Sequence, residues 1–179
     1  MLDRAKTALL VVDFQEKLLP KITHADDIVP QAIRLIRFAH ELELAVLVTE
    51  QYPKGLGRTV QPIVDELRGA VTIEKTAFGC FGDRGFREAL TATGCGQLLV
   101  TGIETHVCVM QTVLAGLESD YEVFVVRDAV GSRHTPDYEA GLARMQAAGA
   151  QLVTTEMALF ELLGEAGTPE FKRVLPLLK

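Results

Sequence analysis

The sequence predicts an α/β fold in which parallel strands alternate with helical crossovers, and two patterns lead to this prediction. Short apolar runs rich in Val, Ile and Leu recur along the 179 residues. These runs are continuous, which is typical of strands that are buried on both faces of a sheet. Most of the runs are separated by stretches with the apolar spacing of a helix, as expected when crossovers connect parallel strands.

Six apolar runs are the predicted strands. The first begins close to the N-terminus, and the last lies in the C-terminal part of the chain. They span residues 8–12, 44–49, 70–73, 97–101, 121–126 and 150–154.

Helices are predicted between these strands. Apolar residues at helical spacing predict one helix over residues 28–42 and another over residues 109–117. A third helix is expected to start at Thr135, because Pro136 suits a first helical turn, and to stop near Gly149.

Two glycine-containing segments, residues 51–59 and 79–85, are predicted loops that follow the second and third strands. In an open parallel sheet, ligands bind beyond the carboxyl ends of the strands, where the strand order reverses. Residues in these loops and at these strand ends are therefore the candidates for chemistry.

Length and composition predict one globular domain that spans residues 1–179. Hydrophobic residues make up 48% and charged residues 23%, the balance of a folded protein and not of a disordered one. The formal net charge of −6, without a basic stripe, argues against nucleic acid as a partner. No apolar stretch approaches the ~20 residues that span a bilayer, so we expect a cytoplasmic protein with no membrane partner.

The three cysteines are Cys80, Cys95 and Cys108. An odd number without a Cys-x-x-Cys pair supports neither a disulfide framework nor a zinc site. Each thiol is therefore considered singly.

Two charged residues follow predicted strands. Asp13 ends the first apolar run and Lys75 follows the third, so both would lie at the carboxyl edge of a parallel sheet. Partial burial at such an edge can raise the basicity of a carboxylate. Taken alone, however, Asp13 is more often a helix cap and Lys75 a solvated surface charge.

Cys108 follows the fourth predicted strand, where Gly102 separates the strand from a helix that Thr105 could cap. The sulfur would then lie in the first helical turn, where the dipole and free N–H groups favour a thiolate and an oxyanion. The alternative is a small core residue, which is what most unpaired cysteines are.

Three segments in this order resemble the isochorismatase-like hydrolase superfamily, whose cysteine members use an Asp-Lys-Cys triad. They are residues 10–15 (LVVDFQ), 74–78 (EKTAF) and 101–109 (TGIETHVCV). The segment 49–57 (TEQYPKGLG) further resembles the subgroup of isochorismatase domain-containing hydrolases. Order and spacing match over nearly the whole chain.

The resemblance implies a three-layer, doubly wound fold, with a parallel sheet of about six strands in the order 3-2-1-4-5-6 and helices on both faces. It implies that Asp13, Lys75 and Cys108 form the triad and that a cis peptide bond joins Ile103 and Glu104. This bond would turn backbone N–H groups toward the substrate carbonyl, so that those of Glu104 and Cys108 form the oxyanion hole. The resemblance also implies a homo-oligomer.

Two departures from better-known relatives narrow the expected reaction. Nicotinamidases of this superfamily carry an Asp-x-His metal motif after the second strand, but residues 50–53 are EQYP, so we expect no metal and no cofactor. True isochorismatases cleave a vinyl ether by acid catalysis and generally lack the cysteine nucleophile, whereas this chain has Cys108.

We therefore expect a metal-independent cysteine hydrolase that acts on a small amide or related carbonyl compound through a covalent acyl-enzyme. Asp13 would accept the thiol proton, and Lys75 would favour the thiolate. Two alternatives remain: a vinyl ether hydrolase with Asp13 as general acid, and a non-enzymatic oligomeric scaffold that retains the site. The residues expected to line the substrate pocket are Phe14, Gln15, Gln51, Tyr52, Phe78, Phe81, Thr105 and His106.

Overall fold

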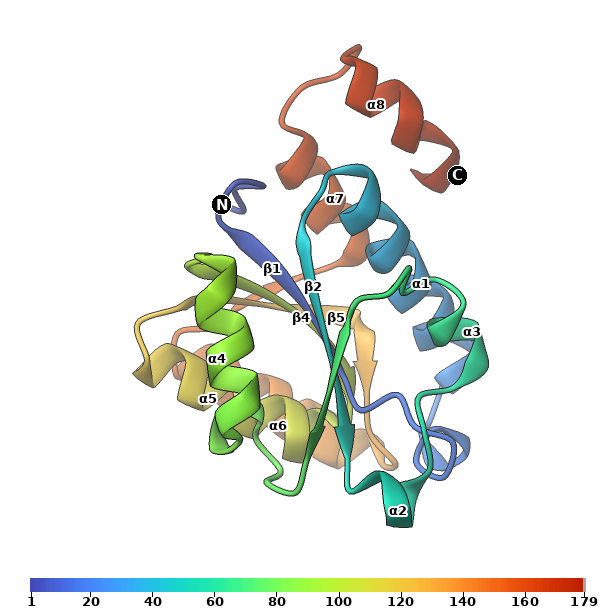
Figure 1. Ribbon diagram of the computed structural model, residues 1–179, viewed down its shortest axis with the longest axis vertical. Coiled ribbons are helices and arrows are strands. Elements are labelled where there is room, and N and C mark those ends of the chain that lie inside the picture. Colours follow the sequence, from blue (N-terminus) through green and yellow to red (C-terminus); the bar gives the residue numbers. More distant parts are fainter. Residues whose placement is uncertain (179) are drawn as a thin grey trace.

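The structure is a computed structural model that describes residues 1–178. One sheet of six strands runs through it in the order β3-β2-β1-β4-β5-β6, and every neighbouring pair is parallel (Figure 1). The strands are β1 (Thr7–Val12), β2 (Ala45–Gln51), β3 (Val71–Lys75), β4 (Gln97–Ile103), β5 (Glu122–Gly131) and β6 (Gln151–Val153). The predicted α/β fold and its strand order are confirmed.

Helices cover both faces of this sheet. The helices of at least six residues are α1 (Ala25–Glu41), α4 (Arg84–Thr93), α5 (Met110–Glu118), α6 (Thr135–Ala147), α7 (Thr155–Leu163) and α8 (Pro169–Val174). The shorter ones are α2 (Pro53–Leu56), α3 (Gln61–Val64), the 3₁₀ turns η1 (Leu19–Lys21), η2 (Cys80–Gly82) and η4 (Leu175–Leu178), and the π-helical turn η3 (Thr105–Val109).

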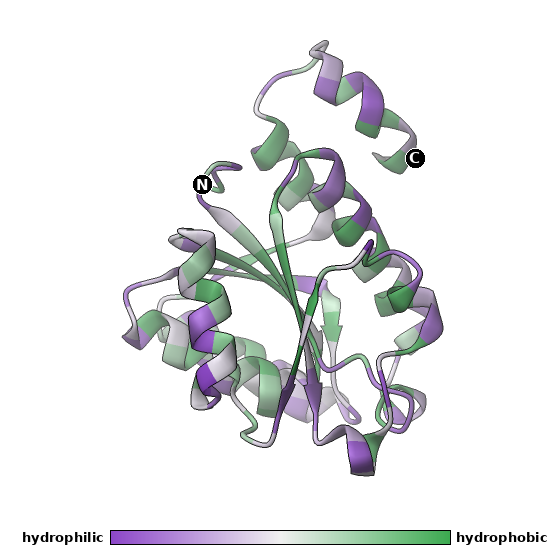
Figure 2. Ribbon diagram, viewed as in Figure 1, coloured by the Kyte–Doolittle hydropathy of each residue, from purple (hydrophilic) through white to green (hydrophobic). Residues whose placement is uncertain are grey.

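Two hydrophobic cores lie on opposite faces of the sheet. One face packs against α1 and α7, through residues such as Leu35 and Leu159, and the other packs against α4, α5 and α6. Because both faces are covered, the strands are hydrophobic over most of their length, and β2 and β3 become hydrophilic toward their carboxyl ends (Figure 2). Polar side chains are thus concentrated where these two strands end.

The strand order reverses between β1 and β4, which are neighbours in the sheet although β2 and β3 separate them in sequence. Gly102 of β4 pairs with Val12 of β1, and its φ is +149°. A Cβ atom at this position would collide with the carbonyl oxygen of Val12, so only glycine permits this close approach. The crevice expected to bind ligands therefore lies beside the residues that follow Val12 and Ile103.

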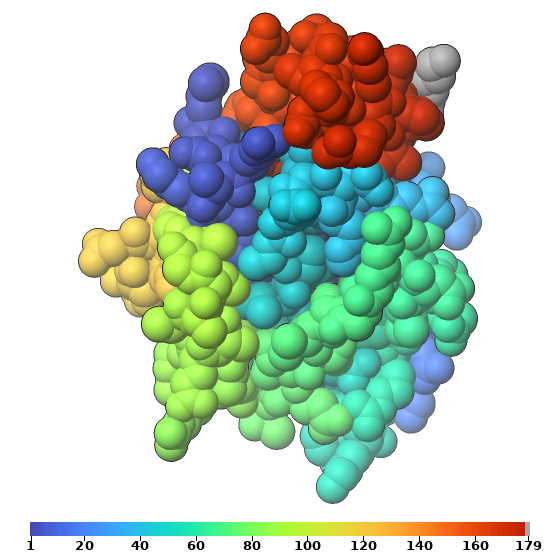
Figure 3. Space-filling model, turned by 45° about the horizontal axis from the view of Figure 1, so that its top comes forward, coloured from blue at the N-terminus to red at the C-terminus, as the bar shows by residue number. Residues whose placement is uncertain are grey.

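The termini lie at the other end of the molecule. The C-terminal segment with α8 packs beside the N-terminal segment and α1, as the red and blue surfaces of Figure 3 show. A single domain over residues 1–179 remains a prediction, and Lys179 lies outside the described residues. None of the helices within residues 1–178 is long and apolar enough to cross a membrane.

Two local predictions need correction. The segment 51–59 is not entirely a loop, because β2 extends to Gln51 and the short helix α2 follows Tyr52. Thr105 does not cap the helix after β4: it is the first residue of η3, and its hydroxyl is a buried group without a hydrogen-bond partner among residues 1–178. The helix start at Thr135 is confirmed.

Candidate active site

Asp13 follows β1 directly and lies at the point where the strand order reverses. Its backbone is left-handed, with φ of 57°, a conformation that Asp tolerates better than most residues. Its N–H donates to the carbonyl oxygen of Thr49 at 3.1 Å, and its side chain is fully buried. Asp13 precedes no helix directly, so the alternative of a helix cap is wrong.

Lys75 ends β3 and reaches Asp13 across the end of β2. Its Nζ donates to Oδ2 of Asp13 at 2.7 Å, to Oε1 of Gln51 at 3.0 Å and to the carbonyl oxygen of Phe78 at 2.8 Å. These three closest acceptors match the three protons of an ammonium group, and the carbonyl oxygen of Ala77 lies farther away at 3.4 Å. Both charged side chains are 0% exposed, so the alternative of a solvated surface charge is wrong for Lys75.

Cys108 lies in η3, the π-helical turn that follows β4. It is 5% exposed and borders the core on the side of α4, α5 and α6. Burial raises the pKa of its thiol, the negative charge of Asp13 raises it further, and the positive charge of Lys75 opposes this only in part. These effects favour the neutral thiol form of Cys108, which lies beside the Asp13–Lys75 ion pair.

The backbone before Cys108 has the geometry of a tight turn. The peptide bond between Ile103 and Glu104 is cis. The carbonyl oxygen of Glu104 accepts hydrogen bonds from the N–H groups of Val107 and Val109, on either side of Cys108 in sequence. The first turn of this helix is therefore held by residues that flank the thiol.

Three further polar residues lie near the triad, and two of them, Thr49 and Thr112, were not identified from sequence. Thr49 donates from Oγ1 to Oδ1 of Asp13 at 2.7 Å, and Thr112 donates from Oγ1 to the carbonyl oxygen of Cys108 at 2.6 Å. Cys80 contacts both: its Sγ lies 3.8 Å from Thr49 Oγ1, and its N–H donates to Thr112 Oγ1 at 3.0 Å. No sequence motif marks Thr49, which lies in the buried strand β2, or Thr112, which lies in α5.

Gln15 and Gln51 are buried supports and not open pocket walls. Gln15 donates from Nε2 to the carbonyl oxygens of Gln51 and Gly57 at 2.9 and 2.7 Å, and its Oε1 accepts from the N–H of Gln51. Gln51 in turn accepts from Lys75 and donates to the carbonyl oxygen of Thr76 at 2.8 Å. Both amides therefore fix the loops around Lys75.

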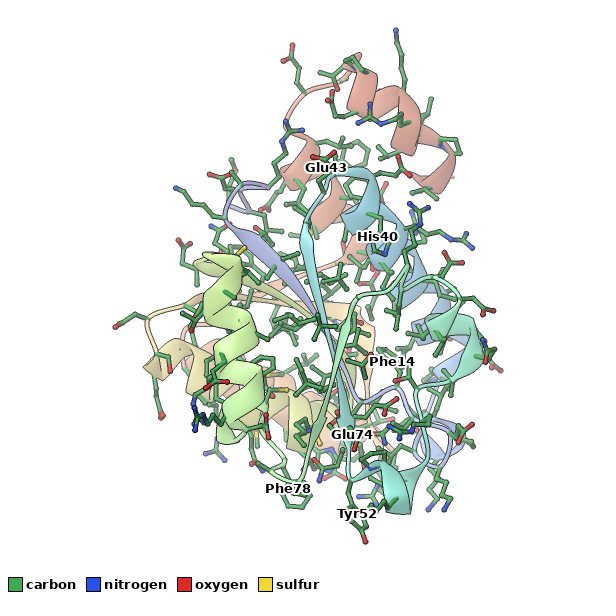
Figure 4. All side chains as sticks on the ribbon, in the orientation of Figure 1. Phe14, His40, Glu43, Tyr52, Glu74 and Phe78 are labelled. Atoms are coloured by element: carbon green, nitrogen blue, oxygen red, sulfur yellow. The ribbon has the colours of Figure 1, made fainter. Side chains whose placement is uncertain are left out.

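Tyr52 and Phe78 lie at the carboxyl edge of the sheet, where Figure 4 shows both side chains at the lower end of the molecule. They are 52% and 55% exposed. The N–H of Tyr52 donates to the carbonyl oxygen of Lys75 at 2.8 Å, and the carbonyl oxygen of Phe78 accepts from Lys75 Nζ. These two aromatic residues therefore lie next to Lys75, and their place in the substrate pocket stays a prediction.

The remaining aromatic candidates pack in or against the two hydrophobic cores. Phe14 is 1% exposed and belongs to the core on the side of α1, on the face opposite Cys108. Phe81 stacks edge to face on Phe86 and Tyr121, with ring centres 5.4 and 5.7 Å away. Phe14 is thus a core residue in this structure, and a place for the partly buried Phe81 in the pocket lining stays a prediction.

His106 is turned toward β5. Its Nδ1 lies 3.0 Å from the hydroxyl of Ser132 and 3.7 Å from the carboxylate of Glu104, which also binds Arg133 at 3.0 Å. Ser132 lines a cavity of about 360 Å³ beyond the end of β5, and the triad lies outside that lining. We give this cavity no role in catalysis, because the buried ion pair and thiol lie elsewhere.

At residues 50–53, where nicotinamidases carry the Asp-x-His metal motif, the Glu50 side chain is occupied by hydrogen bonds within the protein. Oε1 of Glu50 accepts from the N–H and hydroxyl of Thr59 at 2.7 and 2.8 Å, and Oε2 accepts from Arg58 at 2.8 Å. These bonds outweigh the effect of burial and hold the pKa of Glu50 below its usual value. Within residues 1–178, no group of three or more His, Cys, Asp or Glu residues is arranged to hold a metal ion.

Comparison with known proteins agrees with this geometry. The model of the isochorismatase domain matches residues 7–157. The chain belongs to the isochorismatase family. It is 38% identical to isochorismatase domain-containing protein 2 of Xenopus laevis over 174 residues, which cover 97% of this chain and 83% of that protein.

Solved structures of this family have the same fold. The MAR1 ribonuclease of Caenorhabditis elegans is 36% identical, with a TM-score of 0.94 over 99% of this chain and 91% of that one. YcaC of Pseudomonas aeruginosa, with hexane-2,5-diol and covalent acrylamide, is 30% identical, with a TM-score of 0.91 over 98% and 90% of the two chains. The YcaC gene product of Escherichia coli, an octameric hydrolase of unknown specificity, is 30% identical, with a TM-score of 0.87 over 92% and 82%.

Proposed function

We propose that this isochorismatase-family protein is a metal-independent cysteine hydrolase that cleaves a small amide or related carbonyl compound through a covalent acyl-enzyme. One observation carries the proposal: a fully buried Asp13–Lys75 ion pair lies beside the thiol of Cys108. Two buried charges cost several kcal/mol to desolvate, roughly as much as their attraction returns, so stability alone does not explain them. A carboxylate next to a thiol suits general-base catalysis.

In the first step, the sulfur of Cys108 attacks the substrate carbonyl while Asp13 accepts the thiol proton. The raised pKa of Cys108 means that proton transfer accompanies attack, instead of preceding it. The total charge of the site is conserved, because the negative charge moves from Asp13 to the carbonyl oxygen. Lys75 remains an ammonium and holds Asp13 in place.

The oxyanion formed in this step needs donors. We propose the backbone N–H groups of Glu104 and Cys108, each worth about 3–4 kcal/mol in related chemistry. Asp13 then gives its proton to the leaving amine as the C–N bond breaks and a thioester remains on Cys108. In the second half, Asp13 takes a proton from water as the water oxygen attacks the thioester, and it returns this proton to the sulfur as the C–S bond breaks, which releases the acid and restores the Cys108 thiol and the Asp13 carboxylate.

The substrate class follows from charge and site size. Solved relatives include a protein named a ribonuclease, but the net charge of −6 disfavours a polyanion here. Cys108 is only 5% exposed, so the substrate must be small or narrow. We also propose a cytoplasmic homo-oligomer without cofactor, in line with the octameric E. coli relative.

The test is a screen of small amides, ureides and esters, monitored for release of amine or acid. Cys108→Ala and Asp13→Asn should each abolish turnover, and intact-mass spectrometry of the wild type should show an acyl adduct on Cys108. Cys95→Ala is the matched control, because Cys95 lies far from the triad, before β4. Turnover retained in Cys108→Ala would favour vinyl ether hydrolysis, and absence of any turnover in the wild type would favour the scaffold.

A further inference from the structure

The proposed base is held by a second residue besides Lys75. Thr49 of β2 donates its hydroxyl proton to Oδ1 of Asp13, while Lys75 donates to Oδ2, both at 2.7 Å. The carbonyl oxygen of Thr49 also accepts from the N–H of Asp13 at 3.1 Å. A single threonine therefore contacts both the backbone and the carboxylate of Asp13.

Alternation along β2 explains this arrangement. Side chains two residues apart on a strand point to the same face, so Thr49 and Gln51 face the triad while Glu50 faces the opposite side. Gln51 accepts from Lys75, and Thr49 donates to Asp13. One strand thus supplies an acceptor for the cation and a donor for the anion.

The direction of the Thr49 hydroxyl is also determined. Thr49 is 1% exposed, so its single proton must go to a protein acceptor. Cys80 Sγ lies 3.8 Å from the same oxygen. Burial, followed by the charge of Asp13, raises the pKa of Cys80 to about 11, so its thiol keeps its proton at neutral pH and can donate to Thr49.

We propose that Thr49 is a positioning residue for proton transfer from Cys108 to Asp13, and that Cys80 orients the Thr49 hydroxyl. The inference rests on the proposed function, since it takes Asp13 as the base. With both carboxylate oxygens tethered, the rotation of the carboxylate is fixed relative to the sulfur of Cys108.

Acrylamide is a suitable probe, because a relative carries it covalently. The sulfur adds to the terminal alkene carbon, and the thiol proton ends on the neighbouring carbon, so the rate reports deprotonation of Cys108 without knowledge of the substrate. The experiment measures the rate of Cys108 modification by mass spectrometry of the labelled peptide, as a function of pH. Asp13→Asn is measured in parallel.

Thr49→Val keeps the shape of the side chain and removes the hydroxyl. It should slow the modification of Cys108 about 10-fold at neutral pH, the rate change expected from the loss of one hydrogen bond to a charged group. The pH at which the rate falls off on the acid side of the profile should rise by about one pH unit. Thr49→Ser should restore most of the rate and the wild-type pH profile. Thr101→Val is the matched control, because Thr101 of β4 is as deeply buried as Thr49 but donates to the carbonyl oxygen of Ala129.

A wild-type rate and pH profile in Thr49→Val would overturn the inference if Asp13→Asn is slow. If Asp13→Asn is itself as fast as the wild type, the proposed function fails, because Asp13 is not the base. Should Thr49→Val not fold, Cys80→Ala decides: a slower rate with a shifted low-pH limb supports the inference, and an unchanged profile overturns it.

Discussion

Substitution of Lys75 by Met should show how much the fold is destabilised when the buried Asp13 charge loses its partner. Met is similar in length and keeps the aliphatic contacts, but it removes the donor for Asp13, Gln51 and Phe78. Removing one partner of a buried pair leaves an uncompensated charge and costs about 3–5 kcal/mol. At a urea m-value of about 2 kcal/mol/M, the unfolding midpoint of Lys75→Met should fall by about 2 M.

The double substitution Asp13→Asn with Lys75→Met separates charge from packing. It removes both charges, so it should be more stable than Lys75→Met alone, as expected when a buried pair is replaced by neutral groups. For catalysis, the double variant should be little worse than either single one, because members of a catalytic unit are not additive. Circular dichroism in urea and the turnover assay measure the two effects separately.

Lys17→Met is the matched control, because Lys17 is exposed and its Nζ donates to the carbonyl oxygen of Gly55 at 2.9 Å. It should change the free energy of unfolding by less than about 0.5 kcal/mol. A Lys75→Met variant as stable as Lys17→Met would refute the buried ion pair. A double variant less stable than Lys75→Met would refute the electrostatic cause.

Three further predictions concern acid stability, thiol reactivity and metal. The pKa of Glu50 is lowered in the folded protein, so the ionised carboxylate stabilises the fold above the ordinary Glu pKa of about 4.3, and this contribution is lost as pH falls through the folded-state pKa. Glu50→Gln should therefore lower the free energy of unfolding at neutral pH and match the wild type in strong acid. Urea unfolding in which the two proteins differ by the same free energy at every pH would contradict this. Peptide mapping after acrylamide treatment should show that Cys80 reacts more slowly than Cys95, because Cys80 is fully buried and burial raises the pKa of its thiol to about 11. Faster labelling of Cys80 would mean that the segment around η2, which carries Cys80, opens. Dialysis against a strong chelator should change neither the rate of Cys108 modification nor the melting temperature, and a loss that zinc or iron restores would mean that a metal ligand was overlooked.

Much of the fold follows from one-dimensional patterns. The six strands appear as continuous apolar runs because both faces of the sheet are covered, and each run matches a strand to within two residues except for β5, which continues to Gly131. At their carboxyl ends, β2 and β3 continue beyond the apolar run into polar residues such as Gln51 and Lys75. Burial of these residues depends on the loops that fold over them, which hydrophobicity along the chain does not report.

The positions of Asp13, Lys75 and Cys108 at strand ends were predictable from the sequence, because parallel strands place their carboxyl ends at one edge and a three-segment motif names the residues. Only the tertiary structure decided how they interact. The depth of burial makes Lys75 an ion-pair partner and raises the pKa of the Cys108 thiol, and both effects depend on the surrounding chain. The sequence also did not show that Thr49 contacts Asp13 or that Phe14 is a core residue. The face of the sheet on which a side chain lies is set by strand register and local turns, and these depend on contacts between residues far apart in sequence.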